Sequence, residues 1–340
     1  MTEAVVLQRR PYVWHEGNWQ HCLNLQRSGR LPHALLISGS AGIGKAAFAS
    51  ALAQYVLCQS PQVDEACGQC KSCLLLRAGS HPDLMRLEPE TDAKTEKTSK
   101  VIKVDQVREL VEFGSKSAQL SGYRVVIVNP AHVLNVQAAN ALLKTLEEPG
   151  RDTLFLLLTD SPLSLLPTIR SRCQQLALPL PEASFALEWL QALAGSPQAA
   201  TLLLRLARGA PLAAAALLDG GWFSEREALA KELLAVAEAR STALAAAGRW
   251  QRLAADGLVP ALTSLLEDVV YSGLGQGMAV KSQDLLPIIQ RISTRIGTAA
   301  VLRFLQSVAE TRRLLTANIQ PQALNDSLWL EWARLCGAGA

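Results

Sequence analysis

Continuously apolar runs alternate with helical patterns in the first half of the chain. The clearest runs are residues 34–37 (ALLI), 125–128 (VVIV) and 154–158 (LFLLL). Because no polar residue interrupts them, they are typical of strands in a parallel sheet that helices cover on both faces. Between them, one helical pattern begins near Asp105, a favourable N-cap, and another spans about 136–148. This alternation predicts an α/β domain.

The pattern changes near residue 179, after which Ala- and Leu-rich helical patterns take over. Val301, Leu305 and Val308, for example, recur at the i, i+4, i+7 spacing of one helix face. Gly220-Gly221 is a suitable joint within this helical part. We therefore expect an α/β domain at 1–179, a small helical domain at 180–221 and a larger all-α domain at 222–340.

Composition places the chain among ordinary globular proteins. Of its 340 residues, 49% are apolar and 19% charged, and the formal net charge is +3. That net charge is too small to indicate nucleic-acid binding over the whole surface. It is compatible with a local basic patch. The most apolar stretch, 201–218, is interrupted by Arg205, Arg208 and Pro211, and the N-terminus lacks a secretory signal. We expect a cytoplasmic protein with no membrane contact.

A glycine-rich loop follows the first apolar run. Gly39, Gly44 and Lys45 stand at the spacing G-x-x-x-x-G-K, and a helical pattern follows. In such a loop the glycines let backbone N–H groups curl around phosphates, and the lysine reaches the outer phosphates. The spacing predicts a phosphate loop. The alternative is that the loop at present serves only as a strand-to-helix turn and binds no ligand.

Three positions lack the groups that ATP hydrolysis needs. The Ser or Thr that binds Mg²⁺ at the end of the motif is replaced by Ala46. The strand 125–128 ends in Asn129 and Pro130, where an active site of this type carries acidic residues. We therefore expect no ATP hydrolysis at this loop. Weak nucleotide binding through Lys45 stays open, and ATP/Mg²⁺ binding is doubtful.

Four of the seven cysteines lie close together in the sequence. They follow the pattern C-x8-C-x2-C-x2-C and are Cys58, Cys67, Cys70 and Cys73. In a cytoplasmic chain such clustering indicates a metal sooner than disulfides. Four thiolates suit tetrahedral Zn²⁺ with no open position, which is a structural site. An iron–sulfur cluster and reduced free thiols are the alternatives.

Three further segments are recognisable in combination with the loop and the cysteines. They are RLPHALL at 30–36, ANALLKTLEEP at 139–149 and LPTIRSRC at 166–173. With them the chain resembles the clamp-loader subunits of the AAA+ class, most closely the bacterial delta-prime subunits. The resemblance implies an AAA+ domain, then a helical lid and an all-α collar that serves oligomerisation. The helical half resembles the family only in length and character.

The resemblance also implies a role. The family's loader combines delta, delta-prime and three gamma or tau copies, and it places the beta sliding clamp on primed DNA as part of the DNA polymerase III holoenzyme. Its Ser-Arg-Cys motif, here Ser171, Arg172 and Cys173, faces the ATP site of a neighbouring gamma or tau subunit. Arg172 is thus expected to act in trans as an arginine finger, while this subunit hydrolyses no ATP itself.

Chemistry supports an arginine at that position. A guanidinium is permanently charged and offers a fixed fork of donors to phosphate oxygens. A finger supplied in trans contributes about 10³–10⁵ in rate. The alternative is a surface arginine bound to a nearby carboxylate, with Arg170 close by as a structural residue.

We also have expectations for several other residues. Leu212 stands where active relatives carry a sensing arginine, and a first sensor position falls near Thr159-Asp160. Lys144 could approach duplex DNA, although a solvated helix face is the default interpretation. Trp329 and Trp332 are expected to pack in the core or the collar.

Two other function classes compete with this interpretation. One is an active AAA+ ATPase that tolerates its divergent site. The other is a zinc-containing protein that binds nucleic acid directly, against which the near-neutral net charge argues.

Overall fold

The computed structural model describes residues 8–90, 99, 101–120, 122–219, 222–251, 255–314 and 320–337. The chain divides into two units. The first comprises Met1–Glu188 with Ala210–Ala213, and the second Trp189–Gly209 with Ala214–Ala340. The predicted three-domain division at 1–179, 180–221 and 222–340 stays a prediction.

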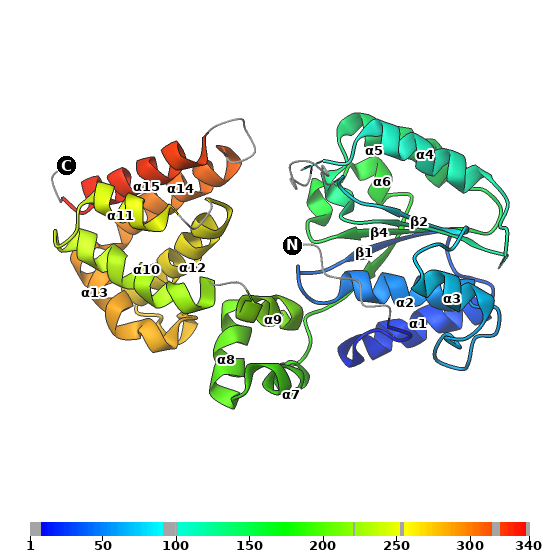
Figure 1. Cartoon of the computed structure of the whole chain (residues 1–340), viewed down its shortest axis with the longest axis horizontal. Coiled ribbons are helices and arrows are strands. Elements are labelled where there is room, and N and C mark those ends of the chain that lie inside the picture. The colour runs from blue at the N-terminus through cyan, green and yellow to red at the C-terminus, as the bar shows by residue number, and fades with distance from the viewer. Residues whose placement is uncertain are drawn as a thin grey trace. The chain divides into compact units, whose positions relative to one another are not determined.

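A parallel sheet forms the centre of the first unit (Figure 1). Its five strands lie in the order β2-β3-β4-β1-β5. The three predicted apolar runs fall in β1, β3 and β4, as expected. The two edge strands carried no clear signal, because their side chains are only partly buried. The strands are β1 (Ala34–Ser38), β2 (Leu84–Leu87), β3 (Arg124–Val128), β4 (Thr153–Thr159) and β5 (Gln174–Ala177).

Helices cover both faces of this sheet, with α1 and α2 on one side and α4 and α5 on the other (Figure 1). Leu35 and Ile37 of β1 enter one core together with Trp19 and Phe48. Leu36, between them, enters the opposite core. Two buried faces leave no exposed position in the middle of these strands, which explains the uninterrupted apolar runs. The helices are α1 (Glu16–Arg27), α2 (Lys45–Leu57), α3 (Lys71–Arg77), α4 (Val104–Ser115), α5 (Val136–Glu147) and α6 (Pro167–Arg170), with short 3₁₀ turns at Val13–His15, Ala131–Val133 and Pro162–Ser164.

All regular structure described after β5 is helical. Together with the sheet, this confirms the predicted class of an α/β domain followed by helices. Helices α7 (Ala183–Ala194) and α9 (Pro211–Asp219) each contain a boundary between the units. The others are α8 (Pro197–Leu206), α10 (Trp222–Ala237), α11 (Ala243–Trp250), α12 (Ala255–Gly273), α13 (Leu286–Ile296), α14 (Thr298–Leu314) and α15 (Pro321–Leu335), with 3₁₀ turns at Gly277–Ala279 and Gln283–Leu285.

Aromatic residues organise the core of the second unit. Trp329 and Trp332 on α15 are buried, as expected from their predicted packing role. The ring of Trp332 lies 5.0 Å from that of Phe304 on α14. Its indole N–H donates to the backbone oxygen of Leu233 on α10, at 3.0 Å. This core therefore joins α14 and α15 to α10, which lies far from them in the sequence.

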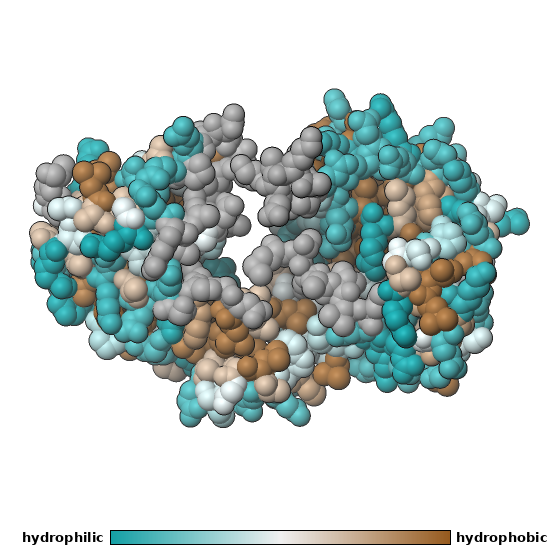
Figure 2. Space-filling view, in the orientation of Figure 1, coloured by the Kyte–Doolittle hydropathy of each residue, from teal (hydrophilic) through white to brown (hydrophobic). Residues whose placement is uncertain are grey.

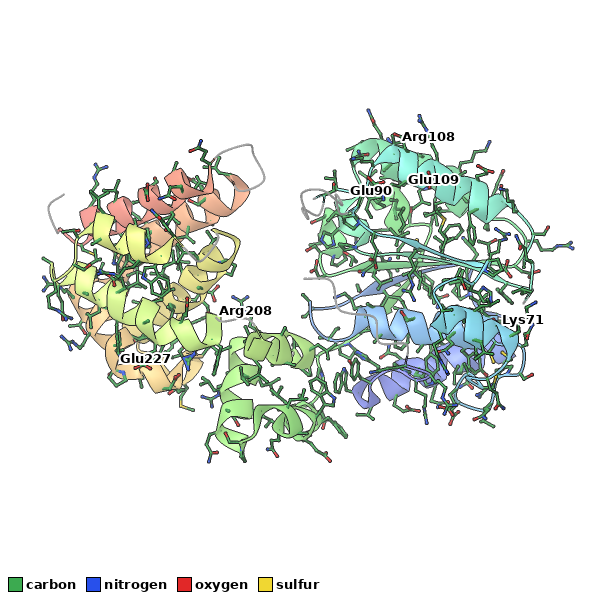
Figure 3. The ribbon with its side chains drawn as sticks, viewed as in Figure 1. Lys71, Glu90, Arg108, Glu109, Arg208 and Glu227 are labelled. Atoms are coloured by element: carbon green, nitrogen blue, oxygen red, sulfur yellow. The ribbon has the colours of Figure 1, made fainter. Side chains whose placement is uncertain are left out.

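The surface is mixed in charge, in line with the small net charge. In Figure 3, Arg108 and Glu109 lie side by side on α4, Lys71 lies on α3, and Glu227 lies on α10. Hydrophilic residues cover much of the visible face in Figure 2, whereas apolar residues gather near α7–α9. Among the described residues no single helix has the length and apolar character of a membrane span. Only Pro197–Leu206 and Pro211–Leu218 taken together reach them, with a bend of 112°.

One buried histidine gives the first unit a pH dependence. The Nε2 atom of His15 lies 2.7 Å from the oxygen of Ile43 and donates to it. Burial lowers the pKa of His15 from its ordinary 6.5, and nearby Lys45 lowers it further, although the hydrogen bond to Ile43 opposes them. The unfolded chain therefore takes up this proton at a higher pH than the folded chain does.

We predict that acidification from about pH 7.5 to about pH 5.5 lowers the free energy of unfolding through His15. This contribution is complete above the unfolded pKa and is lost as the pH falls below it. The measurement is chemical denaturation against pH, with His15→Gln as control, since glutamine can donate to Ile43 but does not titrate. Equal pH slopes for the two proteins would contradict the prediction.

Candidate functional site

The glycine-rich loop lies between β1 and α2, in the strand-to-helix context that a phosphate loop requires. Gly42 and Gly44 have φ angles of 76° and 99°. This left-handed region is costly for any residue with a Cβ atom, so glycine is needed at both positions. Gly44 is also the N-cap of α2, so its backbone begins the helix. The backbone scaffold for phosphate is therefore present.

Side chains of this same chain form hydrogen bonds with the backbone oxygens of this loop. The Lys45 ammonium donates to the oxygens of Gly39 and Ser40, at 2.9 and 2.8 Å. The oxygen of Ile43 accepts from the indole of Trp14 at 2.9 Å, besides His15. These contacts turn the lysine toward loop carbonyls and anchor the loop on the N-terminal segment.

Apolar groups lie directly against the loop glycines. A Cβ atom at Gly44 would stand 2.7 Å from the Tyr12 ring and 3.6 Å from the Leu212 side chain. A Cβ atom at Gly42 would stand 2.5 Å from that of Ala213. The backbone N–H of Leu212 donates to the oxygen of Gly42 at 2.9 Å. Leu212, at the position predicted for a lost sensing arginine, therefore packs on the loop without a charged group to offer.

The neighbouring strand ends supply few groups for catalysis. Ala46 is buried in the first turn of α2 and carries no oxygen in its side chain. Asn129 and Pro130 follow β3, as the sequence predicts. Thr159 ends β4 beside the loop, and its backbone oxygen accepts from the N–H of Gly39 at 3.3 Å. Its hydroxyl lies 3.1 Å from His132.

The structure brings the four clustered cysteines together. Their sulfur atoms all lie within 4.8 Å of one another, and all four thiols are free. The Cys58 sulfur lies 3.5 Å from that of Cys67 and 3.9 Å from that of Cys70, and the sulfurs of Cys67 and Cys73 are 4.0 Å apart. A tetrahedral ion with metal–sulfur bonds of about 2.3 Å would hold its sulfurs about 3.8 Å apart. The set can therefore hold one metal ion.

Backbone N–H groups favour the thiolate form of one of the four clustered cysteines, and a thiolate is the form that binds a metal cation. N–H groups of Gln69 and Cys70 are the main reason that the pKa of the Cys67 thiol falls to about 6. Burial instead raises the pKa of Cys58 and of Cys73. A metal ion would offset that burial cost, because it binds thiolates. Outside the set, Arg77 donates to the oxygen of Gly68 at 3.0 Å and so ties the cysteine loop to α3.

Arg172 follows the short helix α6, and its side chain is 31% exposed. Its Nε donates to one oxygen of Glu147 at 2.8 Å, and its Nη2 donates to the same oxygen. Its Nη1 donates to the backbone oxygen of Thr168 at 2.9 Å. The carboxylate partner that the alternative interpretation requires is thus present. The sequence carried no signal for it, because the two residues are 25 positions apart.

The rest of the predicted motif surrounds Arg172. The hydroxyl of Ser171 donates to the backbone oxygen of Thr168 at 3.1 Å, while Cys173 is buried in the core below α5. Lys144 lies exposed on α5, the helix that ends at Glu147. Ser171 and Cys173 therefore hold the short helix, and Arg172 is the member of the motif with a charged, partly exposed end.

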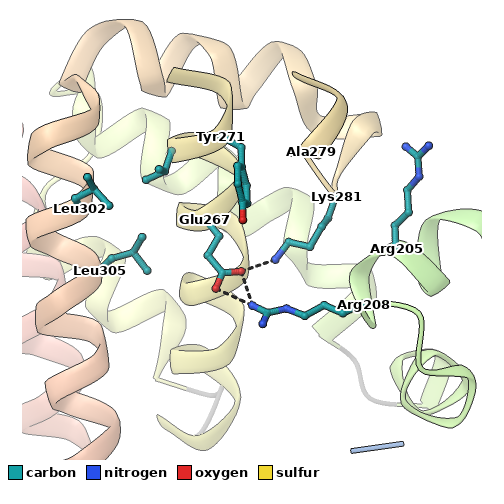
Figure 4. Close-up of a pocket in the computed structure, with 9 residues that line it drawn as sticks. Arg205, Arg208, Glu267, Tyr271, Ala279, Lys281, Leu302 and Leu305 are labelled. Carbon is teal, nitrogen blue, oxygen red and sulfur yellow. Dashed lines mark hydrogen bonds and ion pairs between the residues drawn. The ribbon is translucent and has the colours of Figure 1, made fainter. Parts of the chain in front are cut away.

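The second unit contains a pocket, lined by both apolar and charged side chains, that the sequence did not indicate (Figure 4). Its volume is about 550 Å³. Arg208 donates to both oxygens of Glu267 at 2.7 Å, and Lys281 donates to one of them at 2.7 Å. Burial would raise the pKa of Glu267, but these hydrogen bonds hold it below its ordinary value. The ion pairs connect the end of α8 to α12, with Arg205, Tyr271, Leu302 and Leu305 among the lining residues.

Two family models match the chain. One, described as DNA polymerase III, delta subunit, matches residues 14–182. The other, described as DNA polymerase III, delta subunit, C terminal, matches residues 220–333. The two matches cover both the sheet-containing and the helical parts, including the helical half for which the sequence resemblance was weak.

Similar proteins agree with these matches. DNA polymerase III subunit delta' of Pseudomonas aeruginosa is 40% identical, with 94% of this chain and 98% of that protein covered. The Yersinia pestis protein of the same name is 34% identical, with 96% and 97% covered. A solved DNA polymerase III gamma subunit-related protein of Thermotoga maritima is more distant, at a TM-score of 0.48 and 21% identity over 93% of this chain and 99% of that one. Since the identity extends over nearly the full length of both relatives, this chain belongs to the DNA polymerase III delta-prime subunit family.

Proposed function

We propose that this chain is a clamp-loader subunit that hydrolyses no ATP itself and supplies Arg172 in trans to the ATP site of a neighbouring gamma or tau subunit. Its direct partners are gamma or tau and delta. Through these subunits it acts indirectly on the beta sliding clamp and on primer-template DNA. Its location is the cytoplasm. The observation that carries the proposal is a phosphate loop whose scaffold is intact but whose catalytic groups are missing.

The argument against hydrolysis is chemical. Phosphoryl transfer needs Mg²⁺ held by a hydroxyl and a carboxylate, and it needs an oriented water. Ala46 offers no hydroxyl, and Asn129 and Pro130 offer no carboxylate after β3. Tyr12 and Leu212 lie over the glycine that begins α2. Gly39, Gly44 and Lys45 are therefore retained for the architecture of the loop, with weak nucleotide binding at most.

The argument for Arg172 rests on its charge and its place. Its guanidinium is permanently charged, and the side chain is partly exposed at the end of a four-residue helix. Ser171 and Cys173 fix that helix by a hydrogen bond and by burial. A finger needs this combination of a rigid base and a reachable charged end.

The cysteine set fits a structural zinc ion, Zn²⁺. Cys58, Cys67, Cys70 and Cys73 provide four sulfurs and leave no position for a substrate. Sulfurs this close surround a single ion, whereas the several atoms of an iron–sulfur cluster would hold them farther apart. The ion would join the end of α2 to the start of α3 and so stabilise the connecting loop.

We assign the parts of the chain as the resemblance suggests. Residues 1–179 form the AAA+ domain, 180–221 the lid, and 222–340 a collar that serves oligomerisation. The extensive apolar core of α10–α15 supports a separately packed collar.

We predict that the purified chain turns over no ATP above the buffer background, because the metal ligands are missing. Steady-state phosphate release measures this. Lys45→Ala should leave the signal at background as well. Turnover that Lys45→Ala abolishes would show an active site and contradict the prediction.

We predict about one zinc ion per chain and its loss in Cys58→Ser, since a structural site needs all four ligands. Elemental analysis of the purified proteins measures this, and thermal unfolding should show a lower midpoint for the variant. Cys336→Ser is the matched control, because Cys336 lies outside the cluster. Zinc retained in Cys58→Ser, or iron in the wild type, would refute the assignment.

We predict that Arg172→Ala in the reconstituted loader reduces DNA-stimulated ATP turnover. The site next to it should slow by about 10³–10⁵, while sites served by other fingers continue. Arg172→Lys should not restore the rate, because lysine lacks the planar fork. Arg108→Ala is the matched control, since Arg108 is also paired with a carboxylate on the surface. An unchanged rate in Arg172→Ala would remove Arg172 from the mechanism.

A further inference from the structure

The carboxylate of Glu147 touches Arg172 along one edge of the guanidinium. Glu147 ends α5, and Arg172 follows α6, so the ends of two helices bring the pair together. One carboxylate oxygen accepts from both Nε and Nη2, the side-facing edge of the group. Thr168 takes one N–H from the remaining nitrogen, Nη1. The plane of the guanidinium is therefore fixed from two directions.

The donors that are left suit a phosphate. An arginine has five N–H donors. In Arg172 one on Nε, one on Nη1 and one on Nη2 are engaged in the contacts described. One N–H on each terminal nitrogen is left, and a pair of this kind can bind two phosphate oxygens side by side. The carboxylate thus holds the arginine without using its whole fork.

The energetic reason for such an arrangement is orientation. An arginine side chain has several rotatable bonds, and a free finger would lose the corresponding rotamer entropy on reaching its target. Misplacing a catalytic group by about 1 Å can cost about 10²-fold in rate. Because Glu147 is half-exposed, water screens its charge, so it weakens the field of the arginine only in part.

We propose that Glu147 is a positioning residue for Arg172, which it holds in the geometry that meets a neighbour's γ-phosphate. This inference rests on the proposed function, since it assumes that Arg172 acts in trans. Glu147 touches no substrate in this arrangement and acts only through Arg172. The competing role would be a latch that withdraws the arginine until the neighbour displaces it.

The experiment measures DNA-stimulated ATP turnover in the reconstituted loader that contains Glu147→Ala or Glu147→Gln. Glu147→Ala should reproduce most of the decrease seen with Arg172→Ala. It should lower kcat and leave KM for ATP nearly unchanged, because orientation rather than ATP binding is lost. Glu147→Gln should lose less, since its amide oxygen still accepts a hydrogen bond in nearly the same volume.

Two controls separate positioning from folding. Glu148→Ala removes the adjacent exposed carboxylate, for which no ion pair is described, and should leave turnover unchanged. The double variant Glu147→Ala/Arg172→Ala should be no slower than Arg172→Ala alone, because one residue acts through the other. A purely structural role for Glu147 would instead add a further loss. Should Glu147→Ala assemble poorly, the near-isosteric Glu147→Gln carries the same comparison.

The outcomes are distinct. If Arg172→Ala slows the loader but both Glu147 variants match the wild type, the positioning role is wrong and the proposed function stands. A rise in turnover with Glu147→Ala would identify a latch and also overturn positioning. If Arg172→Ala itself has no effect, both the finger and its positioning residue are refuted.

Discussion

The packing of helices on both faces of a parallel sheet is the constraint on which the rest of the first unit depends. Because β1, β3 and β4 are buried on both sides, their interior positions are apolar, and polar residues such as Ser38, Arg124 and Thr159 stand only at the strand ends. Polar groups that could bind a ligand therefore lie in the loops at the carboxyl ends of the strands, which is where open parallel sheets bind their ligands. The phosphate loop lies at such an end, after β1.

A loop that keeps its glycines while losing its metal ligands has a structural use of its own. Gly42 and Gly44 allow a tight turn into α2, and Tyr12, His15 and Leu212 pack or bond against that turn. These contacts join the N-terminal segment and the start of α9 to the loop that follows β1. The loop therefore serves as an anchored joint between β1 and α2.

The cysteine set and Arg172 are also positioned by helices of the first unit. The cysteine set joins the end of α2 to α3, and Arg172 is held between the ends of α5 and α6. In both, the ends of two helices hold the ionisable groups in place. Such rigid support is what a residue needs if it is to act on another subunit without rearranging its own chain.

The sequence by itself determined the buried strands, the glycine-rich loop and the set of four clustered cysteines. Uninterrupted apolar runs specify strands with two covered faces, and the spacing of Gly39, Gly44 and Lys45 and of the four cysteines is local chemistry that short segments encode. The edge strands β2 and β5 were not predicted, because most side chains of β2 are only partly buried and most of β5 are exposed, so neither strand has an uninterrupted apolar run. Only the tertiary structure decided that Tyr12 covers Gly44, that Glu147 holds Arg172 and that Arg208 reaches Glu267. These partners lie far apart in the chain, so their contacts depend on how helices pack, which no local pattern of residues specifies.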